Sequence, residues 1–294
     1  MNETIYALGF FDGVHIGHRA LLRECRALAE SRGCNAGVVT FGTHPDTLVC
    51  GNTPRLINTP RDRERLLRER FAMDSVITLP FDAAMQKMSW RDFLDMLRER
   101  DGAAGFVCGE DFRFGFRGLG TAWLLADYCA EQGLARAVVP EQTIDGIRVS
   151  STFIRGRIEA GDMTAAVRFL GHPHILSGRV LHGWQIGRRL GIPTANLALP
   201  EELAVPRYGV YACLCHVDGQ TFPAVTNVGV RPTVGGQGVT VEPWILDYSA
   251  DLYDREITLE FHRFLRPERK FSTLEELKEE ILRNAQQTRA FFRT

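Results

Sequence analysis

The stretch GFFDGVHIGHRALL, residues 9–22, joins an apolar run typical of a buried strand to a segment with helical periodicity, through a turn rich in glycine. A strand, a glycine-rich turn and a helix together form a phosphate-binding arrangement. The free N–H groups at the start of the helix point at the ligand, and the helix dipole favours negative charge there. Gly9, Gly13 and Gly17 would let backbone and phosphate approach closely. We expect this turn at the carboxyl edge of an open parallel sheet, where such folds bind ligands.

Two histidines, His15 and His18, follow within the same stretch. Their spacing places both on one side of the predicted first helical turn. The helix N-terminus disfavours imidazolium, whereas a bound triphosphate favours it. Two such groups can hydrogen-bond phosphates and stabilise the charge that develops during attack at phosphorus. Taken alone, an H-x-x-H pair is more often two polar residues filling a turn, so the choice between these interpretations depends on the rest of the chain.

The first half of the chain alternates short β-rich runs with segments of helical periodicity. Repeated alternation of this kind predicts a parallel sheet covered by helices on both faces. The expected strands are 4–11, 36–41, 74–79, 105–109 and 136–140, and the expected helices are 19–32, 61–71, 90–100 and 121–132.

After about residue 172, strand-like runs follow one another with few helical segments between them. Asp218 and Gly219 separate two of these runs and predict a tight hairpin. The pattern is typical of a small antiparallel barrel, closed by one amphipathic helix over about 273–292. We therefore expect two domains, 1–172 and 173–294.

Composition limits the class of protein. The length of 294 residues accommodates two cores, and a formal net charge of −1 argues against broad electrostatic capture of nucleic acid or an anionic membrane. No apolar run approaches the roughly 20 residues that span a bilayer. The N-terminus lacks the features of a signal peptide. We therefore expect a cytoplasmic protein whose seven scattered cysteines, with no C-x-x-C among them, are reduced packing residues.

Several motifs carry a family resemblance. GFFDGVHIGH resembles the G-x-F-D-x-x-H-x-G-H signature of the nucleotidylyltransferase superfamily, whose members transfer a nucleotide onto a phosphate and release pyrophosphate. Four further stretches, in order along the chain, resemble segments of the bacterial bifunctional riboflavin kinase/FAD synthetase (FMN adenylyltransferase) family. They are VVTFGTHPDT (38–47), GEDFRFGFRGLGT (109–121), VSSTFIRGRIEAGD (149–162) and GRVLHGWQIGRRLGIPTANL (178–197).

The resemblance implies a fold and two activities. A Rossmann-like α/β nucleotidylyltransferase domain is followed by a small antiparallel β-barrel riboflavin kinase domain with a C-terminal helix. The kinase phosphorylates riboflavin to FMN with ATP, and the first domain then adenylylates FMN to FAD and releases pyrophosphate. The implied partners are small molecules, ATP, riboflavin and FMN, together with Mg²⁺, and neither nucleic acid nor a membrane is expected.

For the first domain, the resemblance implies that His15 and His18 act on the ATP phosphates. Relatives often have Asn where this chain has Asp111, and S-S-T-x-x-R matches the cluster after residue 149, which taken alone could be a helix cap. An FMN phosphate oxygen is already anionic, so its attack on the α-phosphorus needs no general base. The implied nucleotide- and phosphate-binding residues are Gly9, Phe11, Asp12, Gly13, Gly17, Asp111, Ser150, Ser151, Thr152 and Arg155.

For the second domain, GIPTAN (191–196) resembles the P-T-A-N motif of riboflavin kinase, which implies that Thr194 and Asn196 help hold Mg²⁺. Glu242 matches a general base that acts on the terminal ribityl hydroxyl, although alone it could be a solvent-facing strand residue. Gly183 and Arg188 lie in a glycine-rich stretch that is a candidate flap over the nucleotide.

Some positions depart from the family pattern. Trp244 stands where relatives usually have His, Gly42 and Thr43 are unusual in the second motif, and Thr121 stands where an acidic residue is common. These departures leave open an enzyme with only one of the two activities. A flavin-responsive barrel that reads RNA is a second alternative, against which the near-neutral charge and the paired phosphate motifs speak.

Overall fold

The computed structural model describes residues 3–49, 53–181, 191–233 and 236–293. The chain forms two compact units, Met1–Leu56 with Pro60–Ser151, and Ile57–Thr59 with Thr152–Thr294. Helices α7 (Ser151–Glu159) and α8 (Met163–Leu170) thus lie almost wholly in the second unit. The functional boundary expected between residues 172 and 173 stays a prediction.

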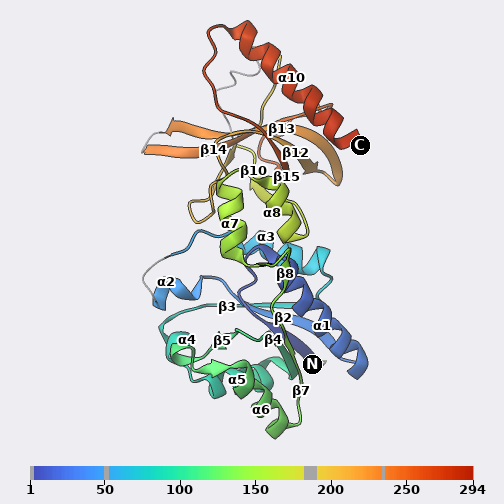
Figure 1. Cartoon of the computed structure of the whole chain (residues 1–294), viewed down its shortest axis with the longest axis vertical. Coiled ribbons are helices and arrows are strands. Elements are labelled where there is room, and N and C mark those ends of the chain that lie inside the picture. Colours follow the sequence, from blue (N-terminus) through green and yellow to red (C-terminus); the bar gives the residue numbers. More distant parts are fainter. Residues whose placement is uncertain (1–2, 50–52, 182–190, 234–235, 294) are drawn as a thin grey trace. The chain divides into compact units, whose positions relative to one another are not determined.

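A parallel sheet of five strands forms the centre of the first unit, in the order β3-β2-β1-β4-β7 (Figure 1). This confirms the predicted α/β class. The strands are β1 (Thr4–Leu8), β2 (Asn35–Phe41), β3 (Ser75–Leu79), β4 (Ala103–Gly109) and β7 (Ala135–Val139). The prediction that β1 extends to residue 11 is wrong. The strand ends at Leu8, and Phe11 has a left-handed backbone with φ 60°.

Helices cover both faces of this sheet. Tyr6 and Leu8 pack with apolar residues of α5 and α6, while on α1 the Cys25 thiol donates a hydrogen bond to the Ile5 carbonyl (3.1 Å). The helices are α1 (Ile16–Arg32), α2 (Pro45–Val49), α3 (Pro60–Arg65), α4 (Ala83–Lys87), α5 (Trp90–Asp101) and α6 (Ala122–Gln132). Two short antiparallel pairs complete the unit, β5 (Arg113–Phe114) with β6 (Gly120–Thr121) and β8 (Thr143–Ile144) with β9 (Ile147–Arg148).

The second unit contains an antiparallel sheet of six strands in the order β10-β15-β12-β13-β14-β11. Its ends are joined just past β10 by a hydrogen bond from the Leu181 N–H to the Asn196 carbonyl (2.8 Å), so the sheet is a nearly closed barrel, as predicted. Asp218 and Gly219 form the expected hairpin, both with positive φ. The strands are β10 (His174–Arg179), β11 (Leu197–Ala198), β12 (Gly209–Val217), β13 (Gln220–Thr233), β14 (Gly236–Ile245) and β15 (Glu256–Pro267).

The C-terminal helix α10 (Leu274–Arg293) packs against this barrel (Figure 1). Its Ala285 joins a small apolar cluster that includes Val210 and Trp244. Arg289 adds a bidentate ion pair with Asp247, at 2.6 and 3.0 Å. The predicted helix over 273–292 is therefore confirmed, and it lies against β12 and β13 of the barrel.

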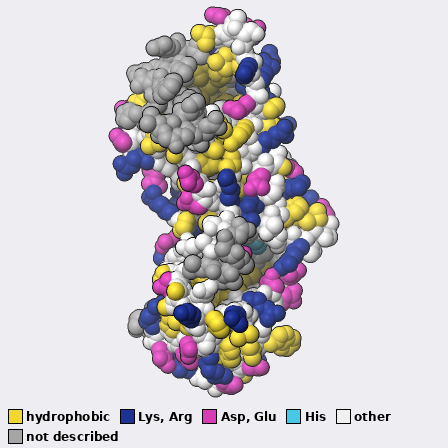
Figure 2. Space-filling model, turned by 90° about the vertical axis from the view of Figure 1, so that its left-hand side faces the viewer, with side chains coloured by type: hydrophobic (Ala, Val, Ile, Leu, Met, Phe, Trp, Pro, Cys, Tyr) yellow, Lys and Arg dark blue, Asp and Glu magenta, His cyan; other side chains and the backbone are white. Residues whose placement is uncertain are grey.

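Composition led to expectations about the thiols and about the surface charge. The six cysteines that the structure describes are free, and burial raises the pKa of the Cys25 thiol to about 12. Basic and acidic side chains are interspersed on the face shown in Figure 2. Among the described helices, none has the length and apolar character needed to cross a membrane.

Candidate active sites

The first candidate site is the turn between β1 and α1. Phe11, Gly13 and Val14 all have positive φ, at 60°, 80° and 42°, and Asp12–Val14 forms a single 3₁₀ turn before α1 begins. Left-handed conformations at non-glycine residues cost about 1–3 kcal/mol each and persist only where the surroundings fix them. The turn is therefore a strained element at the carboxyl edge of the central strand.

Hydrogen bonds from other parts of the first unit fix this turn. The Thr40 hydroxyl donates to the Phe10 carbonyl (2.8 Å), and the Ser151 hydroxyl donates to the Asp12 carbonyl (2.9 Å). The predicted residue Ser151 thus lies at the turn, although more than a hundred residues separate them in sequence. A Cβ at Gly9 would lie 3.1 Å from the Phe11 ring, so the glycine lets that ring pack closely.

The two histidines stack on each other at the start of α1. His15 caps the helix, since its Nδ1 accepts the His18 N–H at 3.3 Å, and the two ring centroids are 3.6 Å apart with an angle of 11° between planes. Burial lowers the pKa of His18 well below its usual value, and the charges of His15 and Arg63 lower it further. His18 Nδ1 is buried and has no hydrogen-bond partner within the described part of the chain. In the free protein His18 is therefore a neutral imidazole at neutral pH, and it lies at the predicted phosphate-binding turn.

Arg63 is a residue of this site that the sequence reading missed. It belongs to α3, is 1% exposed, and its guanidinium carbon lies 4.3 Å from the centre of the Phe10 ring. The charge of buried Asp12 raises its pKa, but burial has the larger effect and lowers it to about 10. A buried arginine beside the predicted phosphate site has no signature in sequence, because the surrounding PRDRER stretch has the composition of an exposed helix.

The remaining predicted residues of this domain lie at the carboxyl edge of β4 and at the start of α7. Asp111 is exposed and forms a 2.5 Å ion pair with Arg148, which also pairs with Glu141 at 2.6 Å. Arg148 is a second residue that the sequence reading missed. Thr152 and Arg155 lie in α7 and belong to the second compact unit, whereas Ser150 belongs to the first.

An aromatic cavity of about 830 Å³ lies in the first unit. Gly115 and Gly118, from the motif GEDFRFGFRGLGT (109–121), form part of its wall. Cationic side chains of Arg113 and Arg117 accompany the rings, so the cavity suits a large planar ring system that carries negative charge. Its aromatic lining is Phe41, Phe81, Phe93, Phe112, Phe114 and Phe116.

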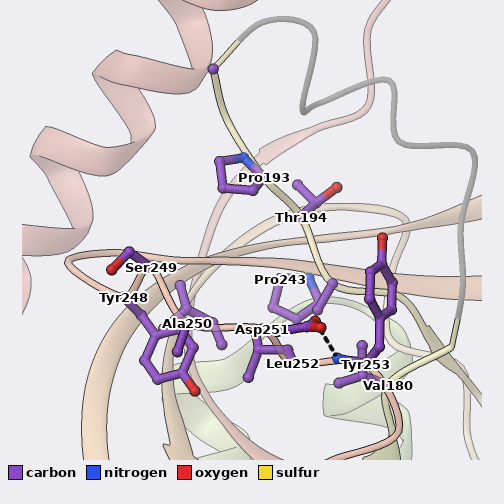
Figure 3. A pocket seen from close by; sticks show the side chains of 13 residues that line it. Val180, Pro193, Thr194, Pro243, Tyr248, Ser249, Ala250, Asp251, Leu252 and Tyr253 are labelled. Carbon is purple, nitrogen blue, oxygen red and sulfur yellow. Dashed lines mark hydrogen bonds between the residues drawn. The ribbon is translucent and has the colours of Figure 1, made fainter.

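The second candidate site is a pocket of about 480 Å³ in the second unit (Figure 3). Thr194 and Pro193 form one wall, Pro243 and Ile245 of β14 form another, and the loop after β14 completes it. In that loop the Asp251 carboxylate accepts the Tyr253 N–H at 3.0 Å, and Tyr248 and Tyr253 add rings to the lining (Figure 3).

Strand register brings two predicted residues of this domain together. Leu197 pairs with Val241, and the Ala195 N–H donates to the Pro243 carbonyl at 2.9 Å, so Asn196 lies across from Glu242. Residues opposite each other in an antiparallel pair share a face. Glu242 therefore lies on the face of β14 opposite to the face that Pro243 and Ile245 present to the pocket.

Two other predictions concern the same region. Trp244 shares the Glu242 face but packs in the apolar cluster with α10, so the structure gives it a packing role. Gly183 and Arg188, in the candidate flap, lie outside the described residues.

The parallel sheet with its phosphate turn, followed by a small barrel with a pocket of its own, defines an enzyme with two nucleotide-dependent transfer domains. Residues 1–153 match the family model described as FAD synthetase, and residues 170–292 match the model described as riboflavin kinase. The chain belongs to the family of bifunctional riboflavin kinases/FMN adenylyltransferases.

Individual relatives agree. The bifunctional riboflavin kinase/FMN adenylyltransferase of Pseudomonas fluorescens is 38% identical over 94% of this chain and 89% of its own length. The protein of that name from Escherichia coli K12 is 34% identical over 98% of this chain and 92% of its own. A crystal structure from Streptococcus pneumoniae, described as a macrolide-efflux protein, is 28% identical with a TM-score of 0.87, and the match covers 98% of this chain and 94% of that one.

Gly17 gives the first testable prediction for the histidine pair. A Cβ at this position would lie 3.1 Å from His15 Cε1 and 3.2 Å from its Nδ1, so the ring must shift by a few tenths of an ångström. We expect Gly17→Ala to lower kcat for FMN adenylylation about tenfold, because small misplacements of reacting groups are costly. Steady-state rates with FMN and ATP measure this. Gly33→Ala provides the control for a general loss of stability, because its φ of 66° strains any side chain although no neighbouring atom lies within 4 Å. An unchanged rate in Gly17→Ala would contradict the prediction.

Proposed function

We infer that the chain catalyses both reactions of its family, phosphorylation of riboflavin to FMN and adenylylation of FMN to FAD with release of pyrophosphate. The stacked histidine pair at the phosphate-binding turn is the observation that carries the second reaction. The placement of Asn196 across from Glu242 supports the first. The cytoplasmic location stays a prediction.

For adenylylation, we propose that the turn after β1 binds the ATP phosphates through its backbone N–H groups, His15 and His18. Bound phosphate would raise the low pKa of His18, so that the imidazole becomes a charged donor when negative charge arrives. The leaving pyrophosphate is stabilised in this way as charge develops on it. By resemblance, Ser150 and Ser151 of the S-S-T-x-x-R motif contribute further donors to the triphosphate.

The aromatic cavity is the proposed flavin site of this reaction. An isoalloxazine ring system is planar and apolar on its faces, which suits the phenylalanine walls. Arg113 and Arg117 favour the phosphate that distinguishes FMN from riboflavin. The nucleophile is a phosphate oxygen of FMN, which attacks the α-phosphorus of ATP while the bond to pyrophosphate breaks, and no proton has to be removed.

For phosphorylation, we propose that Glu242 accepts the proton of the terminal ribityl hydroxyl as the hydroxyl oxygen attacks the γ-phosphorus of ATP. The bond between that phosphorus and the departing ADP breaks in the same step. The carboxylate is half-buried, and the Thr240 hydroxyl donates to its Oε1 at 3.1 Å, which orients the side chain. The pocket beside Thr194 is the proposed site of the adenine base, with Tyr248 and Tyr253 as ring contacts.

Magnesium fits the donor atoms of this site. A threonine hydroxyl and an asparagine amide, from Thr194 and Asn196, are the hard oxygen ligands that this cation prefers. No group of three or more His, Cys, Asp or Glu side chains among the described residues forms a metal cage. The ion would take further oxygen ligands from the nucleotide, and it would supply neutralisation of the phosphate charge.

A time course with riboflavin as the only flavin tests the proposed function. We expect purified protein with ATP and Mg²⁺ to form FMN first and FAD afterwards, separated by chromatography. FMN that accumulates without FAD would remove the adenylylation claim. Conversion of supplied FMN, with no conversion of riboflavin, would remove the kinase claim. Tight RNA binding without any flavin turnover would favour the binding-module alternative instead.

A further inference from the structure

We propose that Arg63 is a positioning residue for FMN adenylylation, which holds the phosphate-binding turn in its strained shape and provides a fixed positive charge beside the two histidines. The proposal rests on the adenylylation activity inferred above.

Arg63 connects the ends of the two strands that carry the site. Its Nη2 donates to the Phe41 carbonyl, at the last residue of β2, with a distance of 2.5 Å. The guanidinium also lies over the ring of Phe10, in the turn after β1. The Thr40 hydroxyl donates to the carbonyl of Phe10. One buried side chain thus links β2 to the backbone just before the left-handed residue Phe11.

The guanidinium has more hydrogen-bonding capacity than this contact uses. Arg63 Nε and Nη1 are buried, and across the residues that the structure describes neither has a hydrogen-bond partner. Buried charges in proteins are normally paired, because an unpaired one loses its hydration without compensation. Burial lowers the pKa of Arg63 only to about 10, so the side chain keeps its charge at neutral pH.

An apolar side chain could fill the same space. Methionine is nearly as long as the arginine stem and packs well on aromatic rings, and apolar replacements of buried charges are often neutral or stabilising. Packing alone therefore does not account for a cation at this position. A triphosphate bound at the turn would bring negative charge next to the guanidinium, which accounts for it.

The charge acts on a group of titratable side chains. Arg63 lowers the pKa of His18, and Asp12 acts on Arg63 in the opposite sense. Removal of the positive charge at 63 would raise the pKa of His18, so the midpoint of the pH–rate limb that the histidines govern would move to higher pH. The elements around the guanidinium carry other titratable and charged groups. They are Asp12, His15, His18, His44, whose ring contacts the Phe10 ring, and Asp62, which forms an ion pair with Arg65.

The experiment compares Arg63→Met, Arg63→Lys and Arg61→Met in the full chain. Arg61 is the matched control, because it is an exposed arginine of the same helix. We expect Arg63→Met to lower kcat/KM for FMN adenylylation by about 30- to 100-fold and to shift the pH midpoint upward by about half a unit. Arg63→Lys, which keeps the charge, should restore the midpoint and part of the rate. Riboflavin phosphorylation, at a site in the other unit, reports whether the protein is intact.

Two results would overturn the proposal. In the first, the adenylylation rate of Arg63→Met falls only in proportion to the loss of folded protein, which thermal unfolding measures, and the pH midpoint does not shift. The other is Arg63→Lys behaving like Arg63→Met in both rate and midpoint. If the unmodified protein makes no FAD from FMN, the proposed function fails instead, and calorimetric titration with ATP then decides on Arg63. Weaker binding in Arg63→Met would support the proposal, and equal affinity would overturn it.

Discussion

His18→Ala is expected to lower the rate of FMN adenylylation by about 10²–10³-fold, the loss typical when one donor to developing negative charge is removed. His18 lies at the start of α1, stacked on His15, with a buried Nδ1 that has no partner among the described residues. Its low pKa in the free protein keeps the ring neutral, so it does not repel His15. When phosphate binds, the ring gains both a partner and a proton. Alanine can neither hydrogen-bond the phosphate nor carry the proton.

Two measurements make this prediction specific. Riboflavin phosphorylation by the same variant should stay within about twofold of the unmodified rate, because the kinase site lies in the other unit. His216→Ala, at an exposed barrel histidine bonded to Thr221, serves as the control for loss of a histidine elsewhere. If His18→Ala stopped both activities while the protein stayed folded, the assignment of two separate sites would be wrong.

Glu242→Gln should have the opposite pattern. A general base contributes about 10²–10⁴-fold to a transfer from an alcohol, and glutamine keeps the shape of the side chain while it loses the capacity to accept the proton. The Thr240 hydroxyl can still donate to the amide oxygen, so the strand should keep its local hydrogen bond. We therefore expect riboflavin phosphorylation to fall by a factor in that range, with little change in KM for ATP.

The control for this variant is Glu256→Gln, at an exposed position of strand β15 in the same sheet. FAD formation from supplied FMN should be unchanged in both variants. A Glu242→Gln protein that phosphorylates riboflavin at the normal rate would exclude the carboxylate as the base. The face opposite the Thr194 pocket would then need another acceptor for the proton.

Apolar patterning predicted the strands of both units well, and it failed where the chain leaves the sheet. The run TIYALGFF is uniformly apolar, so the pattern extends the strand to Phe11. In the structure the strand ends at Leu8, because contacts with Thr40, Ser151 and Arg63 hold the turn. Phe11 and Val14 adopt positive φ there, which their residue types do not favour. The order of the five parallel strands likewise depends on how the connections cross, which the pattern does not encode.

The candidate sites likewise contain residues that the sequence indicated and residues that it did not. The sequence indicated His15, His18, Thr194 and Glu242 because they lie in short stretches that resemble motifs of the family, and their roles stay predictions. Arg63 has no such signal. It is one of three arginines in PRDRER, and only the position of α3 against the turn makes it the buried one.

Because Trp244 packs against α10, we expect the rate of the kinase reaction to depend on this C-terminal helix. Trp244 lies two residues from Glu242 on β14, and its ring is covered by the cluster to which Ala285 contributes. A truncation that removes the last twenty residues would expose this indole to water. It would also remove the packing of α10 against β14, the strand that carries Glu242. Riboflavin turnover would then depend on a segment that contributes no reacting group.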